Sequence, residues 1–355
     1  MAKLRIGMIG AGNIANTHLD AYKKYAKDAE IVAICDINEA RLNETADIFG
    51  IEKRYLSVDE MLKNETLDAA DVCVWNINHA ECSIKALDAG LHVMCEKPMA
   101  YSVEHAEKMI EAAKRNNKLL MIGFVLRFSN ETAVLKDYIE NGYLGDIYYS
   151  KACYVRDHGC PNGWFSDKSL SGGGPVIDLG VHVIDQTRYL MGNPKPVSVY
   201  ASTYNKLSNR PDLKTNPGWM PKGATTKDKC DVEDLGVAMI KYDNGATTLL
   251  EASYSLNGRE NGLKALYGDK GGAEIDTSGL NLYTSVNGYM SEIKPQTARL
   301  NYKEIENFFG AEVCHFVDCC LNGTKCIATA EDGLEIMKIL DAIYKSAETG
   351  HEVIL

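Results

Sequence analysis

The first third of the chain alternates short apolar runs with segments of helical spacing. Ile84 and Leu87 precede Gly90, a residue type that commonly ends helices, and Ser102 is a suitable N-cap for a helix that runs through Met109. Short buried strands that alternate with helices are typical of a parallel sheet with right-handed crossovers. The predicted strands are Leu4–Ile9, Ile31–Cys35, Ala70–Trp75, His92–Cys95 and Leu119–Ile122.

The pattern changes after about Gly123, where β-branched and aromatic residues begin to alternate with polar ones. Asn244-Gly245 is a strong hairpin signal, which favours antiparallel pairing. The predicted strands here are 146–154, 196–204, 237–242, 246–252, 264–267 and 280–283. A long loop is expected over 208–229, and helices over 306–321 and 330–349. We therefore predict an α/β domain over 1–123 and an α+β domain with an open, mainly antiparallel sheet over 124–355, with the final helices in the second domain or packed back on the first.

Composition narrows the function classes. A chain of 355 residues fits two domains, and its net charge of -11 disfavours nucleic acid and anionic membrane surfaces as partners. No apolar run is long enough to span a bilayer, and the N-terminus lacks the apolar region of a signal peptide. The 11 cysteines form no CxxC pair, and Cys35, Cys73 and Cys95 lie in strand-like runs. We expect reduced core thiols and a cytoplasmic location.

A glycine-rich turn follows the first predicted strand. In Gly10-Ala11-Gly12-Asn13-Ile14-Ala15, Gly10 permits a tight turn, Gly12 lets the backbone approach a pyrophosphate, and the helix opened by Asn13 and Ile14 stabilises the phosphate charge. Asp36 ends the second strand, where a carboxylate can accept hydrogen bonds from ribose hydroxyls and would repel a 2′-phosphate. This pattern predicts a Rossmann domain that binds NAD in preference to NADP. Arg41 lies nearby and could admit a 2′-phosphate, so NADP stays possible. The structural alternative is a glycine turn that binds no dinucleotide.

Three further motifs complete a resemblance to a known family. They are Glu96-Lys97-Pro98, the run Ser171-Gly172-Gly173-Gly174-Pro175 with Asp178 and His182 after it, and the ending with Glu331-Asp332-Gly333 and Thr349-Gly350. Together with the glycine-rich start they resemble the glucose-fructose oxidoreductase, inositol dehydrogenase and rhizopine catabolism (Gfo/Idh/MocA) family over nearly the whole chain. The resemblance implies a sugar or polyol substrate between the nicotinamide and the C-terminal sheet. It also implies a homodimer or homotetramer formed through that sheet.

The resemblance also places cofactor contacts. It implies that Asn76, His79 and Glu96 lie near the cofactor, although His79 could equally be a plain N-terminal residue of a helix. Many members have Thr-Pro before the matching asparagine, whereas this chain has Val74-Trp75. Trp75 either packs on the nicotinamide ribose or fills the sheet edge.

Hydride transfer from a carbinol needs a group that removes the hydroxyl proton and a cation that polarises the oxygen. Lys97 suits the second role and could share the first, with Glu96 to orient it. His182 is the better proton acceptor near neutral pH. If 177–191 is helical, Asp178 lies one turn before His182 on the same face and could orient the imidazole or hold a substrate hydroxyl. A surface ion pair or a core histidine is the structural alternative. A D-x-x-x-H pair supplies only two metal ligands, so no metal is predicted.

Other residues are weaker candidates. Arg127 follows the Rossmann domain and could bind the nicotinamide amide or substrate hydroxyls, or form a domain-interface ion pair. Tyr154, Arg156 and Trp164 could line a sugar pocket, because aromatic rings stack on apolar sugar faces. Trp164 could equally fill the core.

The sequence thus predicts an NAD-dependent dehydrogenase or reductase of a sugar, anhydrosugar or cyclitol. One alternative is an enzyme that recycles tightly held NAD, such as a hydride-assisted glycosidase. A second is a non-catalytic dinucleotide-binding regulator, which could lose Lys97 and His182 freely.

Overall fold

The computed structural model describes residues 3–208, 210, 212–214, 218–225, 227–296, 305 and 307–355. The chain forms two units, one of Met1–Phe128 with Asn301–Leu334 and one of Ser129–Leu300 with Glu335–Leu355. The first unit therefore extends past the predicted boundary at residue 123 and includes part of the C-terminal region.

The apolar runs of the first third form one parallel sheet, because strands covered by helices on both faces are apolar on both faces. The sheet has the order β3-β2-β1-β4-β5-β6, and every neighbouring pair is parallel. The five predicted strands of this sheet are confirmed. The strands are β1 (Leu4–Ile9), β2 (Ala29–Cys35), β3 (Lys53–Tyr55), β4 (Ala69–Val72), β5 (His92–Glu96) and β6 (Leu120–Gly123).

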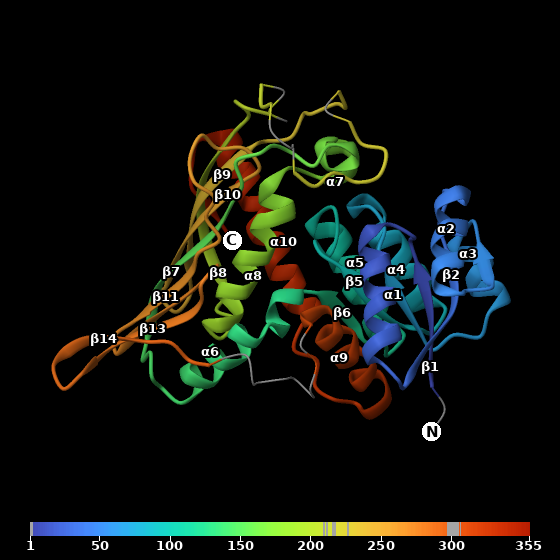
Figure 1. Ribbon diagram of the computed structural model, residues 1–355, viewed down its shortest axis with the longest axis horizontal. Helices are drawn as coiled ribbons and strands as arrows, with labels where there is room; N and C mark the ends of the chain where they lie inside the picture. The colour runs from blue at the N-terminus through green and yellow to red at the C-terminus, as the bar shows by residue number, and fades with distance from the viewer. Residues whose placement is uncertain are drawn as a thin grey trace. The chain divides into compact units, whose positions relative to one another are not determined.

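Helices cover both faces of this sheet (Figure 1). On one side α1 packs against α2 and α9, and on the other α4 packs against α3 and α5. Ser102 caps α5 as predicted, since its side chain accepts a hydrogen bond from the backbone N–H of His105. The helical segments of this unit are α1 (Asn13–Tyr25), α2 (Glu39–Phe49), α3 (Val58–Asn64), η1 (Asn76–Asn78), α4 (His79–Asp88), α5 (Val103–Arg115), η2 (Val125–Phe128) and α9 (Phe308–Asn322), with the start of α10 (Ala330–Thr349).

The strand order determines where a ligand can bind in the first unit. The connections after β1 and β4 leave in opposite directions across the sheet, so a crevice forms at the carboxyl ends of these two neighbours. The loops after β1, β2, β4 and β5 carry the glycine-rich turn, Asp36, Trp75 and Lys97 respectively. The fold thus gathers the predicted cofactor residues of this unit at one edge of the sheet.

The second unit contains a nine-stranded sheet of order β14-β13-β12-β11-β7-β10-β9-β8-β15. All neighbours are antiparallel except β7 and β10, which run parallel. Asn244-Gly245 forms the predicted hairpin between β9 and β10, with Gly245 at φ +85. The strands are β7 (Ile147–Val155), β8 (Pro196–Tyr204), β9 (Leu235–Tyr242), β10 (Thr247–Ser253), β11 (Lys264–Gly268), β12 (Gly271–Asp276), β13 (Gly279–Val286), β14 (Tyr289–Ile293) and β15 (Val353–Ile354).

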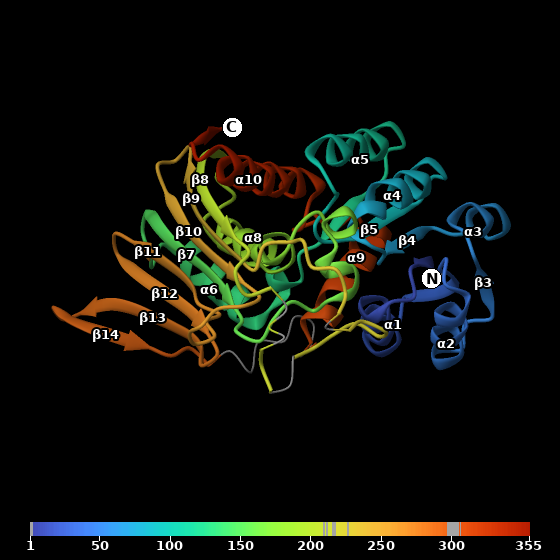
Figure 2. The same ribbon diagram turned by 90° about the horizontal axis from the view of Figure 1, so that it is seen from above.

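Helices lie on one face of this sheet, as Figure 2 shows for α8 and α10. Alternating burial along the strands follows from this one-sided cover, for example in β9, where Ala238 and Ile240 are buried and Met239 is 42% exposed. The helical segments are α6 (Asn130–Glu140), η3 (Gly163–Ser166), α7 (Lys168–Ser171), η4 (Val176–Gly180), α8 (Val181–Leu190) and most of α10.

The predicted α+β architecture with a mainly antiparallel sheet is confirmed, and the strands β3, β12, β14 and β15 were not predicted. In the predicted loop 208–229, the described residues form no helix or strand. Among the described residues, no helix combines the length and the apolar character that crossing a bilayer requires. All 11 cysteines are free, and Cys35, Cys73 and Cys95 are buried.

Candidate active site

The glycine-rich turn leaves open space beside the start of α1. Gly10 has φ +105, and a Cβ there would lie 2.2 Å from the carbonyl oxygen of Cys73, so only glycine fits. A Cβ on Gly12 would meet no protein atom within 4 Å, and no side chain caps α1. Asn13 is exposed and Ile14 is half-buried in the first turn. The free N–H groups at this helix start fit the pyrophosphate of a dinucleotide.

The carboxylate of Asp36 is hydrogen-bonded to this turn. Its Oδ2 accepts a hydrogen bond from the backbone N–H of Ala11 at 2.8 Å, and its Oδ1 accepts one from Asn38 at 2.7 Å. Asp36 is half-buried, and each oxygen has a further lone pair. The position therefore suits hydrogen bonds from ribose hydroxyls and repels an added phosphate.

The loop after β4 carries Trp75 and Asn76. Trp75 is half-buried just before η1, and Asn76 is buried. His79 is 1% exposed, with Nδ1 2.7 Å from the carbonyl oxygen of Pro98 and Nε2 3.1 Å from that of Val74. Burial lowers the pKa of His79, although the bond to Pro98 opposes this. Both ring nitrogens of His79 therefore contact the backbone, and the side chain links the loop after β4 to the loop after β5.

Lys97 stands at the carboxyl edge of the sheet, directly after β5. It is half-buried, and its peptide bond to Pro98 is cis. Oε2 of Glu96 accepts a hydrogen bond from the backbone N–H of Lys97 at 3.1 Å. A Cβ on Gly123 would lie 3.0 Å from Oε1 of Glu96, so the glycine at the end of β6 makes room for this carboxylate. Glu96 therefore orients Lys97 through the main chain.

A buried ionic cluster lies behind Glu96. His18 is 0% exposed, with Nδ1 2.9 Å from Oδ2 of Asp71 and Nε2 3.1 Å from Oε1 of Glu96. Oε2 of Glu312 lies 4.0 Å from the same Nε2. Burial disfavours the imidazolium, but Asp71 and Cys73 together outweigh it, and the pKa of His18 is well above its usual value. Burial raises the pKa of Glu312. The cluster therefore holds a protonated imidazole between carboxylates, which sequence reasoning missed entirely.

The guanidinium of Arg127 is hydrogen-bonded to residues of the first unit. Arg127 is 2% exposed, and its Nη1 donates to Oδ2 of Asp332 at 2.9 Å and to the carbonyl oxygen of Ile327. The guanidinium also lies 5.0 Å from the ring centroid of Phe124. These contacts match the alternative of an ion pair, but one inside a unit, and they give no support to a contact with cofactor or substrate.

In the second unit, the predicted helix 177–191 is divided. The π-helix η4 (Val176–Gly180) holds Asp178, and α8 begins after it with His182 in its first turn; both residues are half-buried. π-helical turns change the angular relation of neighbouring residues and are frequent at functional sites. Tyr254, which is fully buried, donates its hydroxyl to Oδ2 of Asp178 at 2.9 Å. Burial and then the charge of Asp178 raise the pKa of Tyr254, so it stays a donor.

Tyr154 and Arg156 lie at the end of β7. Nη2 of Arg156 donates to the hydroxyl of Tyr154 at 3.1 Å, and the guanidinium lies 5.1 Å from the ring centroid. Burial works against the charge of Arg156, but Tyr154 and Asp178 raise its pKa. Arg156 thus places a fixed positive charge in the electrostatic environment of Asp178.

Aromatic rings gather in and near η3. The ring centroids of Trp164 and Phe165 are 4.0 Å apart, and Phe165 meets Trp219 edge-on at 5.7 Å. Trp164 is half-buried and Trp219 is 51% exposed. This group offers partly exposed rings on which the apolar face of a sugar could stack.

The glycine run before η4 serves internal packing. A Cβ on Gly173 would lie 2.0 Å from the hydroxyl of Tyr344, and one on Gly174 would lie 2.2 Å from the carbonyl oxygen of Glu233. The carboxylate of Glu233 accepts hydrogen bonds from the backbone of Gly174 and Val176 and from Tyr344. Both glycines are buried, so the crowding excludes a ligand there.

Potential metal-ligating groups occur elsewhere in the described residues, and none of them includes Asp178 or His182. The groups are His315, Cys319 and Cys326; His18, Asp71 and Cys73; His18, Glu96 and Glu312; and Asp157, His158 and Glu260. The absence of a catalytic metal stays a prediction.

Comparisons with known proteins cover both units. Residues 4–124 match the NAD-binding Rossmann fold of the GFO_IDH_MocA oxidoreductase family, and residues 136–355 match its C-terminal alpha/beta domain. The chain is 34% identical to D-glucoside 3-dehydrogenase of Escherichia coli, over 99% of this chain and 97% of that one. It is 32% identical to levoglucosan dehydrogenase of Pseudarthrobacter phenanthrenivorans, over 74% of this chain and 70% of the relative.

Solved structures agree with this. Levoglucosan dehydrogenase in complex with NADH and levoglucosan superposes with a TM-score of 0.85 at 26% identity, over 99% of each chain. Aldose-aldose oxidoreductase from Caulobacter crescentus superposes with a TM-score of 0.81 at 27% identity, over 99% of this chain and 100% of that one. The two family domains, in order and over nearly the whole length, show that this chain belongs to the Gfo/Idh/MocA family of oxidoreductases and carries its NAD-binding Rossmann domain.

Proposed function

We propose that this enzyme oxidises a secondary hydroxyl of a pyranoside, with NAD as hydride acceptor, and that carbon 3 of a glucoside is the preferred position. The observation that carries the substrate class is the match to D-glucoside 3-dehydrogenase, at 34% identity over 99% of this chain. Anhydrosugars and cyclitols are the neighbouring possibilities, because levoglucosan dehydrogenase and myo-inositol 2-dehydrogenase are also relatives.

The proposed chemistry rests on Lys97, His182 and Asp178. The ammonium of Lys97 polarises the reacting oxygen, and its place after β5 at the carboxyl edge of the NAD-binding sheet supports this role. His182 accepts the hydroxyl proton as general base. Asp178, held by the hydroxyl of Tyr254 at 2.9 Å, binds a neighbouring substrate hydroxyl or orients the imidazole. NAD, bound by the glycine-rich turn and Asp36, supplies the hydride acceptor.

Specificity for a polyhydroxylated ring is proposed to come from the second unit. Arg156 and Asp178 offer a charged donor and a charged acceptor for adjacent hydroxyls. Trp164 offers a partly exposed ring for the apolar sugar face. We also propose a cytoplasmic location, which the 11 free thiols support.

One alternative has an observation in its favour. The structural similarity to aldose-aldose oxidoreductase, with a TM-score of 0.81, supports an enzyme that returns the hydride to a second sugar. Such an enzyme would keep its NAD through many turnovers and release no NADH.

The test is an NADH-absorbance screen with purified protein, added NAD and a panel of alkyl glucosides, levoglucosan, free aldoses and myo-inositol. The proposal predicts the largest kcat/KM with a glucoside and a 3-keto product by NMR. Product formed without net NADH would support the recycling alternative. Failure of every sugar and cyclitol, in the forward direction and with NADH and keto-sugars, would exclude both.

A further inference from the structure

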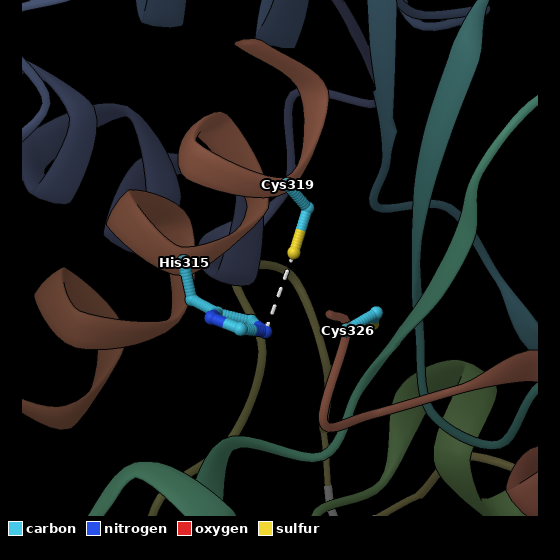
Figure 3. Close-up of side chains that lie close together, drawn as sticks. All are labelled: His315, Cys319 and Cys326. Carbon is cyan, nitrogen blue, oxygen red and sulfur yellow. Dashed lines mark hydrogen bonds between the residues drawn. The ribbon is translucent and has the colours of Figure 1, made fainter. Parts of the chain in front are cut away.

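A histidine and two cysteines converge in the first unit, away from the residues assigned above. His315 and Cys319 lie four positions apart on α9, and Cys326 lies in the segment that follows the helix. Figure 3 shows the two α9 side chains extending toward the segment that carries Cys326. Sγ of Cys319 lies 3.4 Å from Nε2 of His315. The imidazole nitrogen and both sulfurs lie within 4.8 Å of one another.

The hydrogen bonds of this group distinguish the two thiols. Cys319 shares a hydrogen bond with Cys326, which lowers the pKa of Cys326 to about 5 although burial opposes this; hydrogen bonds with the side chain of His315 and with the backbone of Ala328 add to the lowering. The same bond, together with burial, raises the pKa of Cys319. At neutral pH the pair is therefore a Cys326 thiolate beside a Cys319 thiol, which is the protonation state that a nucleophilic cysteine and its resolving partner require.

Cys326 also borders a cavity. It is half-buried and lines a cavity of about 460 Å³, whereas Cys319 is buried. Lys114 and Lys118 line the same cavity, with Glu331 beside them. A partly exposed thiolate near cations and next to a second thiol is the environment in which reactive cysteines occur.

The same three side chains resemble a soft-metal site, but two observations disfavour one. The backbone N–H of Ile327 donates to Nε2 of His315 at 3.1 Å, so the lone pair that a metal would need is already engaged. The lining of the cavity holds Lys114, Lys118 and Glu331, which lies 3.6 Å from Lys114, so the net positive charge of these three residues opposes entry of a divalent cation. Thiol chemistry therefore fits the group better than ligation does.

We propose that Cys326 is a modification site, oxidised by a small hydroperoxide and then joined to Cys319 in a disulfide. The Cys326 thiolate attacks the terminal O–H oxygen of the peroxide; the O–O bond breaks and an S–OH bond forms. The other oxygen leaves as hydroxide from hydrogen peroxide, or as alkoxide from an alkyl hydroperoxide, and takes a proton from solvent. The Cys319 thiol then attacks this sulfenic acid, an S–S bond forms, and the sulfenic oxygen leaves as water with the thiol proton. The two sulfurs lose two electrons and the peroxide gains them.

Closure of the disulfide requires movement, because a disulfide is about 2.05 Å long. The segment that carries Cys326 is paired with the Rossmann sheet. Ala328 accepts a hydrogen bond from Ile122 at 3.0 Å, and Thr329 bridges Met121 of β6. Oxidation would therefore act on the backbone beside β6 without touching the residues assigned to catalysis.

The experiment treats the reduced full chain with hydrogen peroxide, blocks the remaining thiols with iodoacetamide and digests with trypsin. Cleavage after Lys325 separates Cys319 from Cys326, so only a disulfide joins the two peptides. The expected product is that linked pair, with Cys319 identified by fragmentation. Cys319→Ser should instead leave a Cys326 sulfenic acid that dimedone traps, and Cys326→Ser should abolish both products.

Two matched variants control for general oxidation. Cys320→Ser removes the adjacent thiol, whose pKa burial raises to about 12, and should leave the linked pair unchanged. Cys230→Ser removes a thiol of the second unit that is hydrogen-bonded to Cys160, and should also leave it unchanged. Iodoacetamide labelling of Cys326 should be half-maximal near pH 5.

Three results would overturn the proposal. One is a disulfide through Cys320, or between Cys160 and Cys230, while Cys326 stays open to alkylation. Another is labelling of Cys326 that begins only in the alkaline range of an ordinary thiol. The third is one zinc ion per purified chain that shields Cys326 until a chelator removes it, because this would make the group a metal site.

Discussion

Nε2 of His18 lies 3.1 Å from Oε1 of Glu96, the residue that precedes Lys97. This contact joins α1, which opens at the dinucleotide turn, to the strand that presents the lysine. Because His18 is fully buried and also paired with Asp71, the imidazole neutralises carboxylates that water cannot reach. The position of Lys97 therefore depends on a charge balance deep in the first unit.

We predict that His18→Gln lowers the free energy of unfolding by about 3 to 5 kcal/mol, because it leaves buried carboxylates without a cation. The pKa of His18 is raised in the folded state, so its stabilisation is complete below its unfolded pKa of about 6.5 and is lost as pH rises through the folded pKa. The raised pKa of Glu312 acts in the same direction. Urea unfolding across pH should thus show stability falling as pH rises, with a weaker slope in the variant.

Glu312→Gln is the matched control, because an amide replaces a carboxyl group whose raised pKa favours its neutral form. It should cost less stability than His18→Gln at neutral pH. Equal losses in the two variants, or an unchanged pH slope in His18→Gln, would contradict a protonated His18.

Lys97→Ala should reduce kcat by about 10²-fold or more, because the reacting oxygen loses its cation. NAD affinity, measured by fluorescence titration, should change little. Lys97→Arg keeps a positive charge, but its guanidinium does not lose a proton. The kcat of this variant should also be well below that of the wild type if Lys97 takes part in proton transfer. A near-normal kcat in Lys97→Ala would remove Lys97 from the mechanism.

Tyr254→Phe should lower kcat by about 10-fold, the effect of losing one hydrogen bond to a charged group. Because the lost donor favoured the charged form of Asp178, the acid limb of the kcat/KM profile should move to higher pH. Tyr242→Phe is a matched control, since Tyr242, at the end of β9, is also a buried tyrosine and accepts a hydrogen bond from Thr248 at 3.2 Å. A profile that moves equally in both variants would make the role of Tyr254 purely structural.

Asp36→Asn should weaken NAD binding by about 10-fold and NADP binding less, because the substitution removes the charge that repels a 2′-phosphate. The asparagine keeps one oxygen for the backbone N–H groups that Asp36 now binds. Isothermal titration with both cofactors gives the comparison. An equal loss for NAD and NADP would take the ribose role away from Asp36.

The uncovered face of the nine-stranded sheet leads to a prediction about assembly. Tyr200, Met239 and Leu249 pair across β8, β9 and β10, and are 49%, 42% and 41% exposed. A row of exposed apolar side chains favours association with a second copy. Leu249→Arg should lower the mass found by light scattering, whereas Ile48→Arg, at a 63% exposed position on α2, should not. A wild-type monomer would contradict the predicted oligomer.

The sequence predicted the strands of the Rossmann sheet well, because burial on both faces leaves uninterrupted apolar runs such as Leu4–Ile9. It missed β3, since Lys53–Tyr55 is a short, polar edge strand. It also missed β12, which begins Gly271-Gly272, because glycine carries no apolar pattern. Edge strands and glycine-rich strands depend on their neighbours for pairing, which local sequence does not reveal.

The candidate residues divide in the same way. Gly10, Gly12 and Asp36 were predictable, because one turn and one strand end bring them together. The ionic cluster was not, since His18, Glu96 and Glu312 meet only after distant segments pack. The π-helical turn at Asp178 was also invisible, because its residues have the same apolar spacing as an ordinary helix start.

The single parallel pair in the mixed sheet has a consequence for how substrate preference can diverge. Because β7 runs parallel to β10, and β8 and β10 are both antiparallel to β9, β7 and β8 run in the same direction, so the chain between Val155 and Pro196 must travel back along the sheet before it re-enters at β8. Arg156, Trp164, Asp178 and His182 all belong to this excursion. Its loops can change in length and chemistry while the ladders on either side keep their alignment. One scaffold can therefore acquire new sugar preferences without re-evolving its framework.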